Sequence, residues 1–372
     1  MAATWLEEWQ RSLAQVIGAW PLFGQVDEMR RGLGATLDGV RAGVRESAYR
    51  VVLRDEGFAL RCYGPARKSA PALLLVPAPI KAPYIWDLLP RASVVRRCLE
   101  AGFEVFAVEW RPPQISGGQF GLADYADRFL AECLDAVAAG NRDKRAFVAG
   151  HSLGGTFAAI YAALHPERLQ GLVLLGAPFN FGAEIGAFGP IVAAVPSAGE
   201  LIALPGSVPG SLLSSLSFIA SPATFAWSRV LDLLNSIPDP DALETYLAVE
   251  RWTLDERPLA RRLFEEVWEE LFRHNRFMRG TLIVAGKAVR PGRISSPLLA
   301  VIDRRCRIAP PAAVLPLIEA ASSTEKRILW YGGDSGVSLQ HVGMLVGKNA
   351  HQYLWPEILD WMRTLAPRQS LR

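Results

Sequence analysis

A serine surrounded by glycines is the clearest chemical feature of this sequence. In "GHSLGG", Ser152 lies between an apolar run, residues 145–150, and an alanine-rich stretch with helical spacing, residues 153–164. Residues 150–154 fit the pattern G-x-S-x-G, which forms a strained turn between a strand and a helix and exposes the serine hydroxyl. Ser152 is therefore the predicted nucleophile of an acyl-transfer reaction. A purely structural glycine turn is the alternative.

Such a turn also predicts where an oxyanion would be bound. It aims the N-terminus of the following helix at the nucleophile, so the Leu153 N–H can stabilise the oxyanion that forms when Ser152 attacks a carbonyl carbon. A second donor is expected from the loop after the apolar run 72–77. Two prolines in that loop have no N–H, so we expect Ala78, or else Ile80, to donate.

A serine nucleophile needs a histidine as its general base. His341 follows the last apolar run, in "GGDSGVSLQHVGMLVG", where the chain order Ser…acid…His places the base. We expect the other histidines elsewhere: His151 inside the turn and pointing away from the nucleophile, His165 as a capping or surface residue, His274 in a charged helix, and His351 exposed on the last helix.

The elements that must position these residues alternate along the chain. Continuous apolar runs predict strands that are buried on both faces, as in a parallel sheet. They span residues 72–77, 104–110, 145–150, 171–178, 297–303 and 327–333. Helical patterns at 90–101, 122–139 and 153–164 separate most of them, which is the βαβ pattern. Upstream, "YRVVLR" and "FALRCYG" flank a turn signal and predict a hairpin. Together with the serine motif, this predicts an α/β-hydrolase fold with a mostly parallel sheet.

Residues 179–296 interrupt the alternation. They hold proline-rich apolar turns and helical patterns without a clear buried strand, so we expect a helical cap inserted into a core of residues 46–178 and 297–372. The apolar turns indicate either an acyl channel or ordinary packing of the cap. Residues 1–45 predict a helical segment that packs on its own domain or binds a partner subunit or a lipid-like surface.

Composition excludes several classes of protein. The chain has 372 residues, of which 50% are hydrophobic, and a net charge of +3. The sequence has no basic stripe with interleaved aromatic residues, so we do not expect a nucleic-acid partner. The four cysteines are widely spaced, which predicts neither a metal site nor a disulfide framework. The first residues do not resemble a signal peptide, and prolines and a glutamate break the most apolar region, so we expect a cytoplasmic protein without a membrane span or a cofactor.

The sequence resembles the polyhydroxyalkanoate synthases, especially the class III catalytic subunit. "LLLVPAPIKAPYIWDLLP" resembles their first conserved block, "FEVFAVEWRPP" a strand of theirs, "GHSLGGTFA" their nucleophile box and "QHVGMLVG" their histidine loop. The cap helices in "LETYLAVERWTLDERPLARRLFEEVWEELF" also resemble theirs. The resemblance covers residues 45–365. It implies acyl chemistry on a coenzyme A thioester as substrate, a candidate partner subunit and a location at polyester granules.

Two departures from that family lie in the catalytic residues themselves. Ser152 stands where the family has its nucleophilic cysteine, and Cys306 stands where it has the aspartate behind the histidine. A neutral thiol neither fixes the imidazole tautomer nor stabilises the imidazolium well. We therefore expect Asp303, three residues upstream, to orient His341. Asp334, another carboxylate or no acid at all are the alternatives, and Asp303 could also be only a charge at the strand's end.

The change from cysteine to serine also bears on the reaction. An acyl group on a serine oxygen is less activated toward a hydroxyl acceptor than one on a thiol, so water competes better. The sequence therefore favours a serine-dependent hydrolase of hydroxyacyl esters or thioesters. A synthase-type acyltransferase that uses 3-hydroxyacyl-coenzyme A is the alternative, and a non-catalytic binding relative is a further one.

Overall fold

Within the part of the chain that the structure describes, an eight-stranded sheet forms the centre, in the order β1-β2-β6-β3-β7-β8-β13-β14. The strands are β1 (Tyr49–Arg54), β2 (Phe58–Tyr63), β3 (Ala72–Val76), β6 (Glu104–Trp110), β7 (Ala146–His151), β8 (Leu169–Leu175), β13 (Leu298–Asp303) and β14 (Lys326–Tyr331). β1 and β2 form the predicted antiparallel hairpin, and β2 pairs antiparallel with β6. The other neighbours are parallel, so the prediction of a mostly parallel sheet is confirmed.

This is a computed structural model. It describes residues 20–39, 44–65, 69–113, 120–140, 145–182, 185–195, 197–201 and 207–366. The first 19 residues of the predicted N-terminal helical segment lie outside the described residues.

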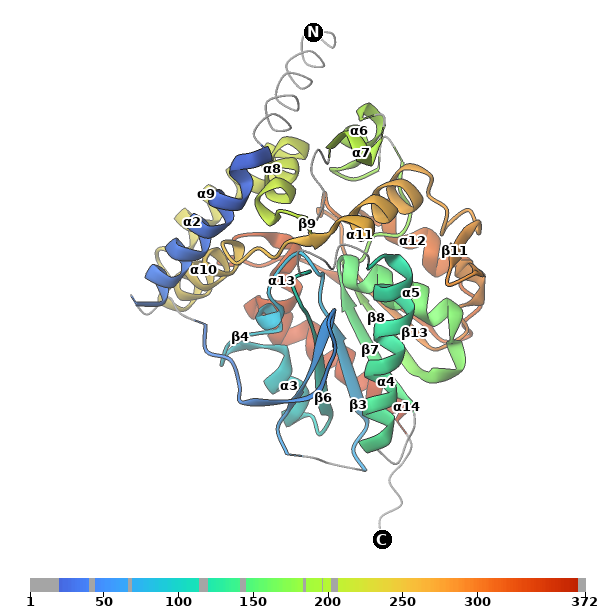
Figure 1. Cartoon of the computed structure of the whole chain (residues 1–372). Coiled ribbons are helices and arrows are strands. Elements are labelled where there is room, and N and C mark those ends of the chain that lie inside the picture. Colours follow the sequence, from blue (N-terminus) through green and yellow to red (C-terminus); the bar gives the residue numbers. More distant parts are fainter. Residues whose placement is uncertain are drawn as a thin grey trace.

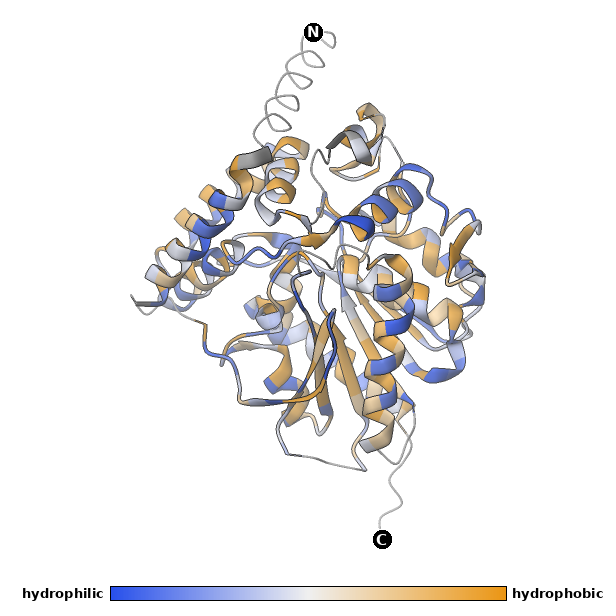
Figure 2. Cartoon of the chain, viewed as in Figure 1, coloured by the Kyte–Doolittle hydropathy of each residue, from blue (hydrophilic) through white to orange (hydrophobic). Residues whose placement is uncertain are grey.

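Helices cover both faces of the sheet (Figure 1). On one face lie α4 (Phe129–Gly140), α5 (Leu153–Leu164) and α12 (Pro311–Ala320). On the other lie α3 (Val94–Glu100), α13 (Gln340–Val346) and α14 (Trp355–Leu365). Alternate residues of β3 enter the two apolar layers, Leu74 and Val76 one and Leu73 and Leu75 the other. Figure 2 shows the central strands as largely apolar. A strand buried on both faces cannot carry polar residues on either, which explains its continuous apolar sequence.

The edge strand β14 departs from the prediction. Its apolar sequence indicated burial on both faces, but most of its side chains are exposed, including Trp330 at 42%. The reason is that β14 is the last strand of the sheet and pairs only with β13. The Arg304 guanidinium lies 4.0 Å from the centre of the Trp330 ring and covers part of it.

Between β8 and β13 the chain forms a group of helices that we call the cap. Its described helical elements are α6 (Gly189–Ala194), α7 (Ala198–Leu201), α8 (Gly210–Ala220), η4 (Ala223–Trp227), α9 (Ser228–Ser236), α10 (Pro240–Thr253), α11 (Arg261–Glu266), η5 (Val267–Arg273) and η6 (Pro291–Arg293). Two short strand pairs, which the sequence did not predict, also lie in this part of the chain: β9 (Ser207–Val208) with β10 (Leu259–Ala260), and β11 (Leu282–Val284) with β12 (Lys287–Val289). Figure 1 shows the cap at the end of the sheet where the parallel strands finish.

The described part of the N-terminal segment, α2 (Trp20–Gly39), lies against the cap. The buried carboxylate of Asp27 accepts hydrogen bonds from the N–H groups of Gly210 and Ser211, at 3.2 and 2.8 Å. These N–H groups start α8 and have no partner within that helix. Asp27 therefore joins α2 to the helix α8 of the cap. Among the described residues, no helix is long and apolar enough to cross a membrane.

Candidate active site

Ser152 occupies a strained turn between β7 and α5. Its backbone has φ 54° and ψ −131°, a conformation that residues with a side chain rarely adopt. The turn is held by the Ser152 N–H, which donates to the Leu175 carbonyl of the neighbouring strand at 3.0 Å. The sharp change of direction lifts the hydroxyl out of the sheet edge, which is what a nucleophile on this type of turn requires.

The three glycines around Ser152 are needed because backbone segments pass very close to them. A Cβ at Gly150 would lie 2.5 Å from the Cα of Gly155. A Cβ at Gly154 would lie 2.3 Å from the Val76 carbonyl oxygen. These distances are shorter than any relaxed contact of a carbon atom. The glycines therefore let α5 pack directly on β7 and on the end of β3, with Ser152 at the junction.

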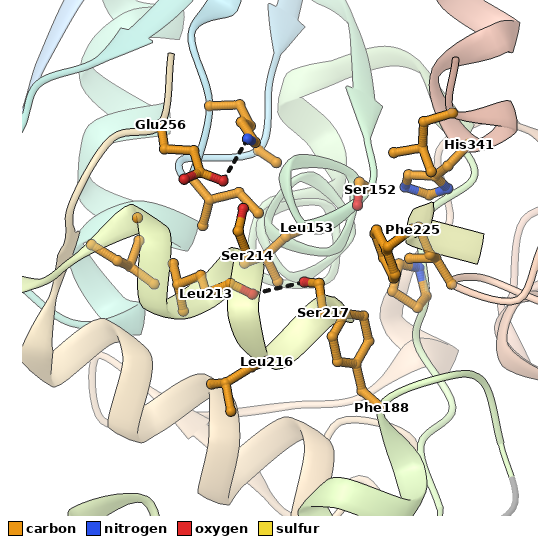
Figure 3. A pocket seen from close by; sticks show the side chains of 18 of the residues that line it. Ser152, Leu153, Phe188, Leu213, Ser214, Leu216, Ser217, Phe225, Glu256 and His341 are labelled. Carbon is orange, nitrogen blue, oxygen red and sulfur yellow. Dashed lines mark hydrogen bonds and ion pairs between the residues drawn. The ribbon is translucent and has the colours of Figure 1, made fainter. Parts of the chain in front are cut away.

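His341 lies in α13, and its ring is buried in the wall of the cavity that Ser152 also lines. Figure 3 shows Ser152 and the His341 ring on the same side of the cavity. The ring nitrogen Nε2 is buried and has no hydrogen-bond partner within the described residues. A buried nitrogen without a partner is costly, and here it is free to take a proton from a nucleophile or a substrate.

The residue behind His341 is Cys306 and not Asp303. The sulfur of Cys306 lies 3.4 Å from Nδ1 of His341 and also accepts the Ala309 N–H at 3.3 Å. Asp303 makes no hydrogen bond to His341: one carboxylate oxygen accepts the Arg305 N–H at 2.8 Å, and the other is buried with no hydrogen-bond partner in the part of the chain that the structure describes. The structure therefore does not bring Asp303 into hydrogen-bond contact with His341, and these contacts do not support its predicted orienting role. The reason is the turn after β13, in which the Asp303 carboxylate accepts the backbone N–H of Arg305 and Cys306 reaches the His341 ring.

Asp334, the alternative acid, has a different task. Its carboxylate accepts the Tyr331 hydroxyl at 2.6 Å and the N–H groups of Asn349 and Ala350 at 2.7 and 3.2 Å. It thus caps the helical turn η7 (Ala350–Leu354). Burial raises the pKa of Asp334, and the hydrogen bonds oppose this rise.

The sequence led us to expect that His151 points away from the nucleophile, but the structure places it at the site. It lines the same cavity, and its ring centre lies 4.7 Å from that of His341. Nε2 of His151 lies 2.9 Å from the His341 carbonyl oxygen, so this nitrogen must carry the proton and donate. Burial lowers the pKa of His151 to about 4. Burial, and then the neighbouring His151, lower the pKa of His341 well below its usual value. Both rings are therefore neutral at pH 7, and His341 can act as a base.

The remaining histidines lie outside the site. His165 ends α5 and contacts Asp127 at 2.7 Å, and His274 is half exposed after η5. His351 was expected to be exposed, but it is buried in η7, where Nε2 donates to the Leu345 carbonyl at 2.9 Å. A histidine whose ring bonds the backbone inside the fold fills a structural role.

The predicted oxyanion donors, Leu153 and Ala78, line the cavity together with Ser152 and His341. Leu153 is the first residue of α5, where N–H groups have no partner within the helix. The loop that carries Ala78 is held by Trp110, whose indole N–H donates to the Pro77 carbonyl at 2.7 Å. This arrangement is compatible with the predicted role of both N–H groups, which stays a prediction.

The cavity has a volume of about 500 Å³ and lies between the sheet and the cap. Apolar side chains of the cap line it, among them Phe188, Leu213, Leu216 and Phe225 (Figure 3). Among the described residues, no group of three or more histidines, cysteines, aspartates or glutamates could hold a metal ion. The site thus combines a serine, a neutral histidine and an apolar cavity, which suits an acyl group.

Comparison with known proteins supports this interpretation of the fold. The sequence profile of the alpha/beta hydrolase fold family matches residues 71–333. This chain belongs to the α/β-hydrolase family. Solved structures have the same fold. The enol-lactonase from Burkholderia xenovorans matches with a TM-score of 0.52 at 15% identity, and the match covers 85% of this chain and 100% of the lactonase chain. The monoacylglycerol lipase of Paleococcus ferrophilus has a TM-score of 0.51 at 16% identity, with 80% and 96% covered.

Within the α/β-hydrolases, this chain is similar to polyhydroxyalkanoate polymerases, which confirms the resemblance found in the sequence. The poly(3-hydroxyalkanoate) polymerase subunit PhaC of Haloferax mediterranei is 28% identical over 292 residues, which are 78% of this chain and 58% of that protein. The subunit PhaC of Allochromatium vinosum is 24% identical over 78% of this chain and 80% of its own length. The chain thus spans less than two thirds of the first of these relatives. Fold and relatives together indicate an enzyme of this class.

Proposed function

We propose that this α/β-hydrolase is a serine acyl hydrolase that cleaves esters or thioesters of hydroxyacyl or similar acids. The observation that carries the proposal is that Ser152, on its strained turn, and His341 line the same cavity, and that Nε2 of His341 has no hydrogen-bond partner among the described residues. A serine and a neutral histidine in one apolar cavity are the minimal parts of a covalent acyl-transfer mechanism.

The reaction would proceed in two halves. Ser152 Oγ attacks the carbonyl carbon while His341 Nε2 takes the hydroxyl proton, and the oxyanion is stabilised by the N–H groups of Leu153 and Ala78. When the tetrahedral intermediate collapses, the leaving thiol or alcohol takes the proton from Nε2, and the acyl group remains on Ser152. His341 then accepts a proton from water, whose oxygen attacks the ester, and Ser152 recovers its proton when the acid leaves.

Cys306 would act behind His341 as a neutral hydrogen-bond partner. Burial raises the pKa of this thiol to about 11, so it is protonated at pH 7. The Nδ1–H of His341 can donate to its sulfur, which selects the tautomer with a free Nε2. A thiol gives no negative charge to stabilise the imidazolium, so we expect a slow enzyme with a correct geometry.

The substrate and the fate of the acyl group can be tested together. Purified protein is mixed with (R)-3-hydroxybutyryl-coenzyme A, and thiol release is followed. The molecular masses of the products are determined by mass spectrometry, with Ser152→Ala as the control. The proposal predicts thiol release with free 3-hydroxybutyrate, lost in the control. A protein that releases no thiol from this substrate and does not react at Ser152 with a fluorophosphonate would contradict it and would favour a non-catalytic binding relative.

A synthase-type acyltransferase is the second candidate, and the polymerase names of the relatives favour it. It would pass the acyl group from Ser152 to the hydroxyl of another hydroxyacyl unit instead of to water. Association with polyester granules and a partner subunit belong to this candidate. Oligomers of hydroxybutyrate among the products would establish it over hydrolysis.

A further inference from the structure

The segment that leads into His341 is held by a carboxylate from the cap. Asp232, in the middle of α9, accepts the N–H groups of three successive residues: Gly336 at 2.9 Å, Val337 at 2.8 Å and Ser338 at 2.7 Å. The Asp232 side chain is 7% exposed. His341 follows three residues after the last of these donors, in the first turn of α13.

The backbone of this segment is unusual and needs such a partner. Gly336 has φ 76° and Ser338 has φ 58°, both in the left-handed region. For Ser338 this conformation is strained, and it persists only where the surroundings enforce it. Alternating conformations of this kind point successive N–H groups toward one anion. Asp232 supplies that anion from inside the molecule.

A second contact joins the same segment to the cap. The Ser338 hydroxyl donates to Glu250 of α10. Glu250 in turn pairs with Arg229 of α9, whose Nε lies 3.0 Å and whose Nη2 lies 2.5 Å from the two carboxylate oxygens. Arg229 and Phe225, just before it in η4, line the active-site cavity. The cavity wall and the histidine segment therefore meet at α9.

The helix α9 itself is fixed by these polar contacts more than by apolar packing. Its polar side, with Asp232 and Ser236, faces inward and is buried. Its apolar side faces solvent, with large side chains that are more than half exposed: Trp227, at the end of η4, and Val230, Leu231, Leu234 and Ile237. A helix that buries little apolar surface owes its position to its hydrogen bonds. A shift of α9 would therefore also release the segment before His341.

We propose that Asp232 is a positioning residue, which ties the cap to the histidine segment so that His341 is correctly placed only while α9 is docked. This role rests on the proposed function of His341 as the general base. The part of the proposal that concerns the fold, a coupling between α9 and residues 336–346, does not depend on which substrate is cleaved.

The test converts the Asp232 carboxylate into an amide, which replaces one oxygen by an NH2 group. In Asp232→Asn the NH2 group takes the place of one oxygen and faces backbone N–H donors. Some of the three N–H groups therefore lose their acceptor, while the shape of the side chain is conserved. The matched control is Asp239→Asn: Asp239 also caps backbone N–H groups of the cap, those of Asp241 and Ala242. Ala242 lies beside Gly336, but the hydrogen bonds described for Asp239 stay within the cap. Each full-length protein is measured by hydrogen exchange with mass spectrometry and by steady-state kinetics on (R)-3-hydroxybutyryl-coenzyme A.

In Asp232→Asn we expect amide exchange in the peptide that covers residues 336–346 to accelerate about tenfold or more. We expect kcat to fall about tenfold or more with KM changed less than about threefold, because a misplaced base affects the chemical step and not the binding of the acyl group. The control should keep both quantities within about twofold of the original protein.

Two results would overturn the proposal. One is unchanged exchange in residues 336–346 of Asp232→Asn. The other is an equal fall of kcat in Asp239→Asn, which would show a general effect of the cap. If the original protein does not turn over the thioester at all, the proposed function fails, but the exchange measurement still decides whether α9 holds the histidine segment.

Discussion

At the scale of single residues, the site differs from a complete triad by one side chain. A sulfur atom, 3.4 Å from Nδ1, stands where a carboxylate would hold His341. A carboxylate at this place fixes the tautomer and stabilises the imidazolium, and its loss from a serine enzyme typically lowers kcat about ten-thousandfold. The thiol can accept the Nδ1–H of His341 but supplies no negative charge to stabilise the imidazolium.

The first prediction concerns this thiol. Cys306→Asp should raise kcat/KM for the thioester about tenfold or more, because it supplies a negative charge behind His341. Cys306→Ala should lower kcat/KM, because it removes the partner of Nδ1 without replacing it. Both are measured by thiol release at pH 7, with a thermal melt to verify folding. A folded Cys306→Asp protein that is no faster than the original would show that the missing charge does not limit the reaction.

At the scale of elements, the position of Ser152 depends on how closely α5 approaches the sheet. Only glycine fits at the points of contact, and Gly154 is the tightest of them because carbonyl oxygens of β3 and of the loop after it lie within 2.5 Å of a Cβ there. The turn is therefore a packing feature of three elements, β3, β7 and α5, and not a property of the short motif alone.

The second prediction tests this packing. Gly154→Ala should destabilise the fold by about 3 kcal/mol or more and abolish the reaction of Ser152 with a fluorophosphonate, because the methyl group must displace backbone. The matched control is Gly140→Ala at the end of α4, where a Cβ would meet no atom of the described residues within 4 Å. This control should be neutral or slightly stabilising in urea unfolding. Equal stability of the two variants would contradict the account.

The sequence predicted the elements of the core and the strained turn that carries Ser152, but not the side-chain contacts that depend on the conformation of turns. The strands β3 and β7 and the helix α5 follow from apolar periodicity and from the glycines, which are local signals. The partner of His341 depends on the turn from Asp303 to Cys306, where the Asp303 carboxylate bonds the Arg305 N–H. The exposure of β14 follows from its place at the sheet edge, which no local pattern reveals.

At the scale of the whole molecule, buried neutral histidines make the fold sensitive to acid. Burial lowers the pKa of both His151 and His351 to about 4, and that of His341 well below its usual value. In the unfolded chain these histidines have their usual pKa of about 6.5. Below that pH the unfolded chain therefore binds more protons at these side chains than the folded protein does. Asp334 and Glu46, whose pKa values are raised by burial, act in the opposite direction.

The third prediction follows from this balance. The free energy of unfolding should fall as the pH drops from 6.5 to 4, by on the order of 2 kcal/mol each for His151 and His351. Urea unfolding at pH 7, 5.5 and 4.5 measures this. His351→Gln keeps a donor for the Leu345 carbonyl but cannot titrate, so its unfolding free energy should depend less on pH. The same urea midpoint at pH 7 and 4.5 would contradict the prediction.

The most direct measurement of the central claim is to find the acyl group on the protein. After rapid mixing with (R)-3-hydroxybutyryl-coenzyme A and acid quenching, the tryptic peptide of residues 146–168 is examined by mass spectrometry. The account predicts that one hydroxybutyryl group is attached to Ser152 in this peptide, and that the adduct is absent in Ser152→Ala. Thiol release without this adduct, or with the acyl group on Cys306, would contradict it.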